Sequence, residues 1–398
     1  MGINEIKYQF ILFEKNITIK ISTTLLYLNN MKYGAYKGMN KKIINFFQQR
    51  EGSAARMMDR MPKVVQKTAV RALSYPYQYT NLDPFIQCVL AVQHKQGKAG
   101  IIHGDILQSR KQFEKQMQIL CSKKTKVKRV EDIRLPLQSK TIFARHYHPE
   151  PHKKLPMVVY YHGGGFVLGS VDSYDDVCRL LAVHAQVQVL SIEYPLAPEA
   201  GPSEIIQICE DALAWTYQNR KNLKIFKNRI AVAGDSAGGN LATVVAQQSK
   251  TKKYAPRAQL LIYPTTDFAN RYPSYYAYKD GLILTASDVD IVIEQYAKKH
   301  HVALNDSSIS PLYGNLRKLA PTLLITAQYD VLHDEGEIYA ERLKQQGVKV
   351  KYINYEDQTH GFISFTPISK NAKKHTITMF KEFRKFWNKQ EGYFWNIF

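Results

Sequence analysis

Short apolar runs that alternate with helix-like segments are the feature that most constrains the fold of this chain. The stretch "VEDIRLPLQSKTIFARHYHP", from residue 130, alternates polar and apolar residues as a pair of antiparallel strands does. Continuous apolar runs follow at 155–161, 187–193, 229–235, 258–264, 321–327 and 348–355. Such runs are typical of strands buried on both faces. Their alternation with helices predicts an α/β fold with a mostly parallel, eight-stranded sheet covered by helices on both faces.

The apolar pattern also suggests how the chain divides. Between about residues 46 and 120 the apolar residues have helical spacing. We therefore assign residues 1–125 to a basic N-terminal segment and a helical cap lobe, and 126–398 to the α/β domain. The strand pattern is interrupted at 266–312, where we expect an insertion belonging to the cap. Ser287 and Asp290 resemble the N-cap and N3 residues that open a helix there, and a last helix is expected near 372–388.

The charge of the chain is strongly basic and unevenly distributed. The formal net charge is +21, and residues 1–150 contain 26 basic and 10 acidic side chains, so they account for +16 of it. A solvated, lysine-rich surface explains this excess more simply than a nucleic-acid site, because the basic run at 123–134 lacks interleaved aromatic residues. We predict no nucleic-acid partner, and keep a weak contact with an anionic membrane surface as an alternative.

The cysteines and the N-terminal residues bear on location. Cys88, Cys121, Cys178 and Cys209 form no CxxC pair, which indicates neither a zinc site nor a disulfide scaffold. We expect no metal, reduced thiols and a cytoplasmic protein. In residues 1–30 the apolar pieces are short and broken by Lys and Glu, so neither a signal peptide nor a membrane span is expected. Met31 and Met39 are alternative starts.

The stretch "AVAGDSAGGNLA" at 231–242 places a serine between glycines directly after an apolar run and before a helix-like segment. This is the context of a nucleophile elbow, a sharp turn that exposes a serine hydroxyl. Gly234 and Gly238 avoid the clashes that a Cβ atom would cause in such a turn. Ser236 is therefore the predicted nucleophile, and the amide of Ala237 is expected at a helix N-terminus.

A serine hydroxyl needs a general base, and an imidazole base needs a carboxylate that orients it. His360 follows the last predicted strand, so we expect it on a loop at the edge of the sheet where Ser236 stands. Asp330 ends the strand before that one and is the expected carboxylate. The alternatives that sequence alone leaves open are His162 and His333 for the base and Asp334, Glu335 and Asp357 for the carboxylate.

The stretch "HGGGF" at 162–166 follows another apolar run. Backbone amides of glycines can approach a substrate closely, and pre-aimed amide donors stabilise the oxyanion that forms when a nucleophile attacks a carbonyl. Gly164, Gly165 and Ala237 are the expected donors, while Gly163 either joins them or serves the turn. Phe166 and Asp235 are candidate substrate contacts.

Together these motifs resemble the hormone-sensitive-lipase-like family of α/β hydrolases, which includes bacterial carboxylesterases and arylacetamide deacetylases. The resemblance covers about 130–365 and includes "YPLAPEAGPSEIIQICEDALAW", "LIYPTTD", "AQYDVLHDEGEIYAERLKQQGV" and "HGF". The order Ser236, Asp330, His360 is the α/β-hydrolase order of these roles. Two departures are Pro195, where the family usually carries arginine, and the basic first hundred residues, which match the family only loosely.

The resemblance implies an α/β-hydrolase fold with a helical cap and a carboxylic-ester hydrolase. We expect it to act on short to medium acyl esters through an acyl-enzyme, without a cofactor. An amidase, a deacetylase or an acyltransferase uses the same intermediate and remains an alternative. A small-molecule receptor is a further alternative, because some relatives keep the fold, lose a triad member and only bind a ligand, but all three triad positions are present here. The sequence leaves open whether the protein is a homodimer.

Overall fold

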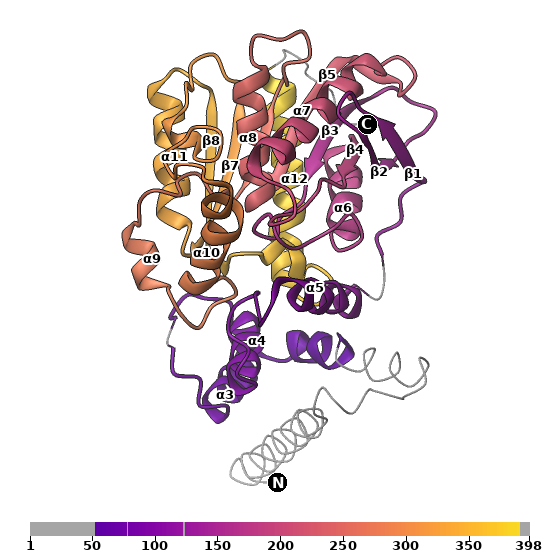
Figure 1. Ribbon diagram of the computed structural model, residues 1–398. Coiled ribbons are helices and arrows are strands. Elements are labelled where there is room, and N and C mark those ends of the chain that lie inside the picture. The colour runs from indigo at the N-terminus through magenta and orange to yellow at the C-terminus, as the bar shows by residue number, and fades with distance from the viewer. Residues whose placement is uncertain (1–51, 78, 122–123, 391–398) are drawn as a thin grey trace, which may run out of the picture. The chain divides into compact units, whose positions relative to one another are not determined.

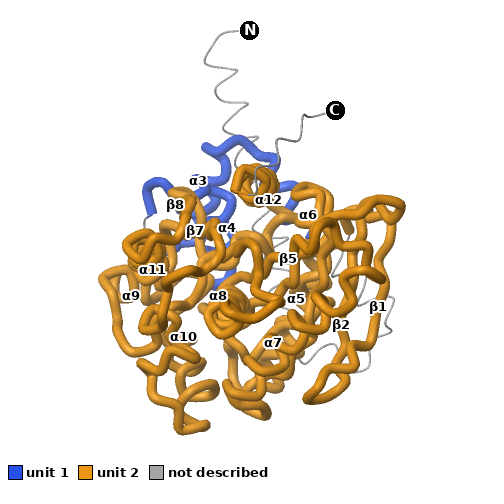
Figure 2. The backbone as a smooth tube through the Cα atoms, turned by 90° about the horizontal axis from the view of Figure 1, so that it is seen from above, with its two compact units in different colours: residues 1–98 blue, residues 99–398 orange. Residues whose placement is uncertain are grey.

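A computed structural model describes residues 52–77, 79–121 and 124–390 (Figure 1). The contacts divide the chain into two compact units, residues 1–98 and residues 99–398 (Figure 2). The second unit contains the whole sheet and includes the helix α5 (Ile106–Leu120). The cap lobe assigned to residues 1–125 stays a prediction, and the expectations about residues 1–45 fall outside the described residues.

In the second unit the described residues form one sheet with the strand order β1-β2-β4-β3-β5-β6-β7-β8. The strands are β1 (Arg129–Pro136), β2 (Thr141–His148), β3 (Leu155–Tyr161), β4 (Gln188–Ile192), β5 (Ile225–Asp235), β6 (Gln259–Ile262), β7 (Thr322–Tyr329) and β8 (Val350–Thr359). β2 pairs antiparallel with both β1 and β4, and the remaining pairs are parallel. This confirms the predicted eight-stranded, mostly parallel sheet.

Helices cover both faces of the sheet (Figure 1). They are α6 (Asp175–Ala185) and α12 (Lys370–Gln390) on one face, and α7 (Pro202–Gln218), α8 (Ala237–Ser249) and α11 (His333–Gln345) on the other. Alternate residues of each strand supply the two cores. In β3, Val159 and Tyr161 pack into the core on the α7 side, and Val158 and Tyr160 pack into the core on the α6 side. A strand that is buried on both faces has apolar side chains at successive positions, which explains the continuous apolar runs in the sequence.

The described part of the first unit is helical. Residues 52–60 form a helix, followed by α3 (Lys63–Ala72) and α4 (Pro84–Lys95). The side chain of Asp83 caps α4 by accepting hydrogen bonds from the amides of Phe85 at 3.0 Å and Ile86 at 3.2 Å. Pro84 occupies the first helical position, where its missing N–H costs no hydrogen bond. The helical spacing predicted for this part of the chain is confirmed.

The insertion after β6 contains α9 (Pro273–Ala277), α10 (Ala286–Val292) and a π-helical turn, Ile293–Ala297. The predicted helix start at Ser287 and Asp290 is wrong by two residues. Thr285 is the N-cap of α10, and Asp288 closes the capping box with it. The Asp288 carboxylate also accepts hydrogen bonds from the amides of Ile101 and Ile102, which ties the start of this unit to the insertion.

No helix in the part of the chain that the structure describes is both long and apolar enough to cross a bilayer.

Candidate active site

The three predicted catalytic residues follow three different strands of the parallel part of the sheet. Ser236 comes directly after β5, Asp330 after β7 and His360 after β8. The carboxyl ends of parallel strands lie at one edge of a sheet, so the three side chains share that edge. β5 and β7 are both hydrogen-bonded to β6, and β7 to β8, so the three strands lie close together.

Ser236 adopts a backbone conformation that an L-residue rarely takes, with φ 54° and ψ −121°. Its amide donates a 2.9 Å hydrogen bond to the carbonyl of Ile262, which holds the turn. A Cβ atom on Gly238 would collide with the carbonyl oxygens of Tyr161 and His162, and one on Gly234 would lie 2.6 Å from the carbonyl of Tyr161. The elbow therefore packs directly against the end of β3. Only glycine fits at position 234, two residues before the serine, and at position 238, two residues after it.

The Ser236, His360 and Asp330 side chains form a continuous hydrogen-bonded chain. Nε2 of His360 lies 2.9 Å from Oγ of Ser236, and Nδ1 lies 2.7 Å from Oδ2 of Asp330. The other carboxylate oxygen of Asp330 accepts a 2.9 Å hydrogen bond from the amide of Leu332. All three side chains are buried. The structure thus brings together the nucleophile, base and carboxylate that the sequence predicted.

The rival histidines lie in other surroundings. The ring of His162 stacks on Tyr194 and Tyr174, with centroids 4.3 Å and 5.6 Å away, and Nδ1 lies 2.8 Å from the carbonyl of Gly163. Burial lowers the pKa of His162 to about 4, which keeps the imidazole neutral at physiological pH. His333 lies at the first position of α11, where its Nδ1 is 3.0 Å from Asp334.

The rival carboxylates are engaged elsewhere. Asp334 accepts a hydrogen bond from the amide of Ser274, Glu335 from the amide of Thr266, and Asp357 bonds Asn371 and His375. Burial raises the pKa of Glu335 well above its ordinary value. None of these three carboxylates has a hydrogen bond to His360 among the described residues.

The glycines after His162 form a tight turn beside the elbow. Gly164 and Gly165 have φ angles of 116° and 61°, and a Cβ atom on Gly164 would collide with the carbonyl of Leu168. Within the described ranges, the amides of Gly164, Gly165 and Ala237 have no hydrogen-bond acceptor in the protein. These three amides therefore have no partner in the described protein, and their role as oxyanion donors stays a prediction.

Gly163, Asp235 and Phe166 each have contacts inside the protein. The amide of Gly163 donates a 3.0 Å hydrogen bond to Oδ1 of Asp235, so this amide is already occupied. Asp235 is 2% exposed. The Phe166 ring is fully buried and stacks on Tyr296 at 3.8 Å. These contacts hold both side chains inside the protein, and the substrate contact expected of Asp235 and Phe166 stays a prediction.

Arg110 of α5 holds the far end of the same turn, and sequence reasoning missed it. Its guanidinium donates to the carbonyls of Val167 and Ala197, both at 2.7 Å, and forms a bidentate pair with Glu199. A planar fork with five N–H donors suits this bridging of two loops. The segment "YPLAPE" that contains Glu199 was the only signal pointing to this contact.

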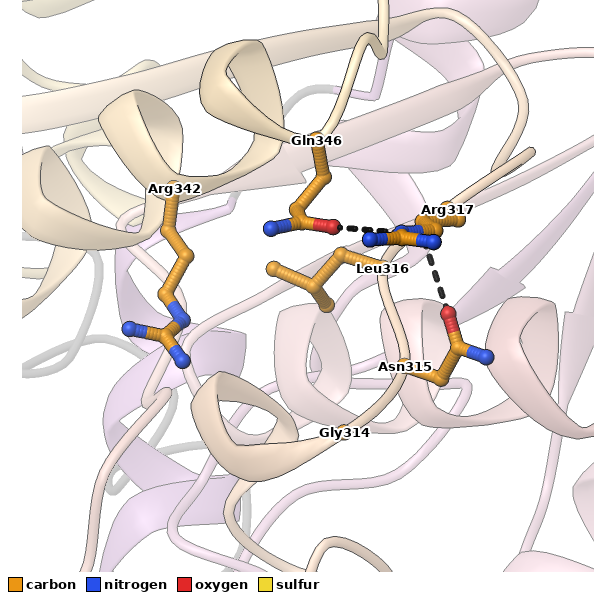
Figure 3. Close-up of a pocket in the computed structure, with 6 residues that line it drawn as sticks. All are labelled: Gly314, Asn315, Leu316, Arg317, Arg342 and Gln346. Atoms are coloured by element: carbon orange, nitrogen blue, oxygen red, sulfur yellow. Dashed lines mark hydrogen bonds between the residues drawn. The ribbon is translucent and has the colours of Figure 1, made fainter.

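Two surface pockets have linings that contain none of the three triad residues. One, of about 320 Å³, is lined by Gly314, Asn315, Leu316, Arg317, Arg342 and Gln346 (Figure 3). Arg317 precedes β7, whereas Asp330 follows it, so this pocket lies at the opposite edge of the sheet. The other, of about 270 Å³, lies between α5 and the segment after His360, and its lining includes Met117, Cys121 and Ile363.

The described residues contain free thiols but no arrangement of side chains suited to a metal ion. There, no group of three or more His, Cys, Asp and Glu side chains is arranged to hold a metal ion. Cys88, Cys121, Cys178 and Cys209 are free thiols, and all but Cys121 are buried. Burial raises the pKa of Cys88 and Cys121 to about 12. These thiols are therefore protonated and poorly nucleophilic at neutral pH.

Comparisons with known proteins agree with this geometry. A sequence model of a family described as having an alpha/beta hydrolase fold matches residues 158–364. The carboxylic ester hydrolase LipN of Mycobacterium tuberculosis (strain ATCC 25618 / H37Rv) is 36% identical over 291 residues, which cover 71% of this chain and 77% of LipN. An ethyl acetate hydrolase of Pseudomonas putida is 35% identical and covers 68% of this chain and 87% of its own length.

A solved structure is similar as well. The esterase of Pyrobaculum calidifontis is 38% identical, with a TM-score of 0.67, over 71% of this chain and 93% of its own. Sequence motifs, sheet topology and relatives thus lead to one assignment. The chain belongs to the hormone-sensitive-lipase-like family of α/β hydrolases.

Proposed function

We propose that this protein is a carboxylic-ester hydrolase that acts through a Ser236–His360–Asp330 triad and an acyl-enzyme. The observation that carries the proposal is the hydrogen-bonded chain through His360, 2.9 Å from Ser236 and 2.7 Å from Asp330. Support also comes from relatives named as a carboxylic ester hydrolase and an ethyl acetate hydrolase, each at least 35% identical.

In the first half of the reaction, Oγ of Ser236 attacks the ester carbonyl carbon while Nε2 of His360 takes the hydroxyl proton. The carboxylate of Asp330 keeps the other ring proton on Nδ1 and stabilises the imidazolium that forms. The amides of Gly164, Gly165 and Ala237 bind the negative oxygen of the tetrahedral intermediate. The intermediate collapses when the carbon–oxygen bond to the alcohol breaks and His360 returns its proton to the leaving alkoxide.

In the second half, water takes the place of the alcohol. His360 removes a proton from the water as it attacks the acyl carbon, and the same amides stabilise the second oxyanion. Collapse breaks the bond to Oγ, the proton returns from His360 to Ser236, and the carboxylic acid leaves. The two half-reactions balance without a cofactor, since every proton and electron pair comes from the ester, the water or the triad.

Short to medium acyl esters are the substrate class we propose. The ester group itself reacts with the oxyanion amides and the triad alone. The relative named as an ethyl acetate hydrolase supports a substrate with a small acyl group. A series of p-nitrophenyl esters from acetate to palmitate, assayed with wild type and Ser236→Ala, tests both the reaction and the acyl preference. Equal rates for the two proteins would refute the proposal, and a rate maximum on palmitate would refute the acyl class.

Amide hydrolysis is the alternative that the same intermediate permits. Matched p-nitroanilides distinguish it, because an amide leaving group must be protonated as it departs and an activated ester does not need this. Faster release from the anilide than from the ester of the same acid would favour an amidase. We expect the ester to react faster by several orders of magnitude.

A further inference from the structure

The pocket shown in Figure 3 has a basic lining and takes no part in the proposed reaction. Its volume of about 320 Å³ is within the range of small-molecule sites. Residues 314–317 supply most of the lining and precede β7, whereas Asp330 follows that strand, so the pocket and the triad lie at opposite edges of the sheet. Two of the six lining residues are arginines, and none of the six is acidic. Such a lining favours a negatively charged ligand.

Gln346 turns a hydrogen-bond donor toward this pocket. Its Oε1 accepts a 3.1 Å hydrogen bond from Nε of Arg317. A guanidinium group only donates, so the amide oxygen of Gln346, and not the nitrogen, has to face Arg317. The amide nitrogen Nε2 consequently points to the other side, toward Arg342 (Figure 3). In the described part of the chain this nitrogen has no acceptor.

The two arginines keep most of their N–H groups free. Within the described ranges, the side chain of Arg317 uses only Nε for a hydrogen bond, and the guanidinium of Arg342 forms no hydrogen bond or ion pair. The two guanidinium groups lie on either side of the Leu316 side chain (Figure 3). Three side chains thus present unused donors around one apolar side chain.

Neither the end of α11 nor the adjacent acid uses Arg342. The carbonyls of residues 342–344, in the last turn of α11, accept hydrogen bonds from the amides of residues 346–348. These carbonyls therefore do not need a basic side chain as a cap. Glu341, which precedes Arg342, pairs instead with Lys344 at 2.6 Å. The charge of Arg342 is therefore free to act on a ligand.

A third cation lies against the loop that carries Arg317. The ammonium of Lys250 donates hydrogen bonds to the carbonyls of Asn315 at 2.8 Å and Arg317 at 3.4 Å. Burial lowers the pKa of Lys250, and the charge of Lys318 adds to this shift. Among the described residues, no carboxylate forms an ion pair with Lys250, Arg317 or Arg342. Like charges gathered without an acid repel one another, and a bound anion would relieve this repulsion.

We propose that this pocket binds a small organic phosphate, whose oxygens accept hydrogen bonds from Arg317, Arg342 and Nε2 of Gln346 and whose carbon part lies against Leu316. Guanidinium groups bind phosphate with paired N–H groups, which makes these contacts strong. A phosphate monoester has three terminal oxygens and a charge of about −1.5 to −2 at pH 7, so it can face two arginines better than a carboxylate can. The inference concerns binding alone and does not depend on ester hydrolysis.

Phenyl phosphate and benzoate are the probes, because they share an aromatic ring and differ in the anionic group. Isothermal titration calorimetry with the full-length protein at about pH 7.5, where phenyl phosphate has lost its second proton, measures both affinities. We expect phenyl phosphate to bind wild type with a Kd below about 1 mM, and benzoate to bind at least about tenfold more weakly. Equal affinity for the two probes would overturn the assignment of a phosphate site.

Single substitutions test the two arginines. Arg317→Gln and Arg342→Gln should each weaken phenyl phosphate binding at least about fivefold. Arg220→Gln is the control for Arg317→Gln, because Nε of Arg220 also donates to a side-chain amide oxygen, that of Asn228 at 2.9 Å. Arg384→Gln is the control for Arg342→Gln, because both side chains are exposed. The control variants should bind as wild type does. Equal losses in the pocket and control variants would show a general effect of charge and overturn the proposal.

Gln346→Glu tests the site without removing an arginine. Glutamate keeps an oxygen that faces Arg317 and replaces the Nε2 donor with an acceptor. Phenyl phosphate binding should weaken at least about tenfold. Gln345→Glu is the control, because Gln345 is exposed and lies outside the lining. Unchanged affinity in Gln346→Glu would contradict the proposed contact, and this variant decides the question if an arginine variant does not fold.

The melting temperature gives a second readout. Phosphate salts stabilise many proteins without a specific site, so the rise in Tm is compared between two double variants of equal net charge. About 10 mM phenyl phosphate should raise the Tm of wild type and of Arg220→Gln/Arg384→Gln, and should raise that of Arg317→Gln/Arg342→Gln by less than about half as much. An equal rise in all three proteins, or no rise in wild type, would refute a specific site.

Discussion

Nε2 of His360 lies 2.9 Å from Oγ of Ser236, although the two residues are 124 positions apart in the chain. The carboxylate of Asp330 at Nδ1 favours the tautomer in which that nitrogen carries the proton, so Nε2 is free to accept. In the proposed mechanism, this contact sets the direction of proton transfer, from serine to imidazole, before a substrate binds.

Removing the nucleophile should abolish ester hydrolysis while leaving the fold intact. In Ser236→Ala the Oγ atom that bonds His360 is lost, and alanine fits the same backbone turn about as well as serine does. We expect kcat on p-nitrophenyl acetate to fall by at least about 10⁴-fold. Circular dichroism and the melting temperature serve as the control for folding, and residual activity above 1% of wild type would contradict the assignment.

Neutralising the carboxylate tests the role of Asp330 separately. Asp330→Asn keeps the size of the side chain and the acceptor for the Leu332 amide, but an amide no longer selects the Nδ1–H tautomer of His360. We expect kcat at pH 7 to fall by about 10³- to 10⁴-fold. Asp334→Asn is the comparison, because this neighbouring carboxylate bonds Ser274. An equal loss in both variants would argue against a specific role for Asp330.

The packing of the oxyanion turn predicts a compensating pair of substitutions. A Cβ atom on Gly165 would lie 2.5 Å from Cγ2 of Val292, and the φ angle of 61° adds strain of its own. Gly165→Ala should therefore lower kcat by about 10²-fold, the size of effect that a displaced oxyanion donor produces. Val292→Ala removes the colliding methyl groups. The double variant should recover at least about fivefold over Gly165→Ala, and strictly multiplicative effects in this double-mutant cycle would contradict the contact.

The titration of Asp235 should make stability depend on pH in a way that asparagine abolishes. Burial raises the pKa of Asp235 from 3.8 to about 6. The folded protein then binds the proton at pH values where the unfolded chain has lost it, so the stability from this group is greatest at low pH and declines as pH rises from about 4 through about 6. A shift of about two units corresponds to about 3 kcal/mol.

Urea unfolding of wild type and Asp235→Asn at pH 4.5 and 7.5 measures this effect. The asparagine variant has no proton to lose, so wild type should become less stable relative to it as pH rises. The groups that face Asp235 are Tyr160, Tyr174, Tyr263 and His360. Burial raises the pKa of the three tyrosines well above the ordinary value, so they remain protonated across this range. A difference that is constant with pH, or that grows in the opposite direction, would contradict the prediction.

The sheet was predictable from the sequence because its strands are buried on both faces. The run predicted at 155–161 is β3, and the runs predicted at 187–193, 258–264 and 321–327 each start one residue before the observed strand. β5 begins at Ile225, four residues before the predicted run at 229–235. The prediction missed these residues because the backbone of this first part is irregular. Lys227 and Asn228 have positive φ angles there, and no periodic pattern marks such residues.

The positions of site residues were predictable where a local motif or the end of a predicted strand defines them. Ser236 and Gly164 belong to short motifs with a fixed backbone geometry, whereas the contacts of Asp235 and Arg110 join residues that the sequence separates widely. Asp235 bonds Gly163 across 72 positions, and Arg110 bonds Val167 across 57. The start of α10 was misplaced for a related reason: both Thr285 and Ser287 can cap a helix, and the position of Asp288 against Ile101 and Ile102 decides between them.

The parallel strands give the second unit two chemically distinct ends. Ser236, Asp330 and His360 lie at the end where the parallel strands finish. The turn at 346–347, between α11 and β8, lies at the end where these strands begin. Gln346 is exposed, and a Cβ atom added to Gly347 would have no other atom within 4 Å. An immobilisation handle or a fluorescent label fixed to a cysteine at position 346 would thus lie at the edge of the sheet opposite to Ser236, Asp330 and His360. The protein could be attached to a solid support in one orientation, with its catalytic edge toward the solution.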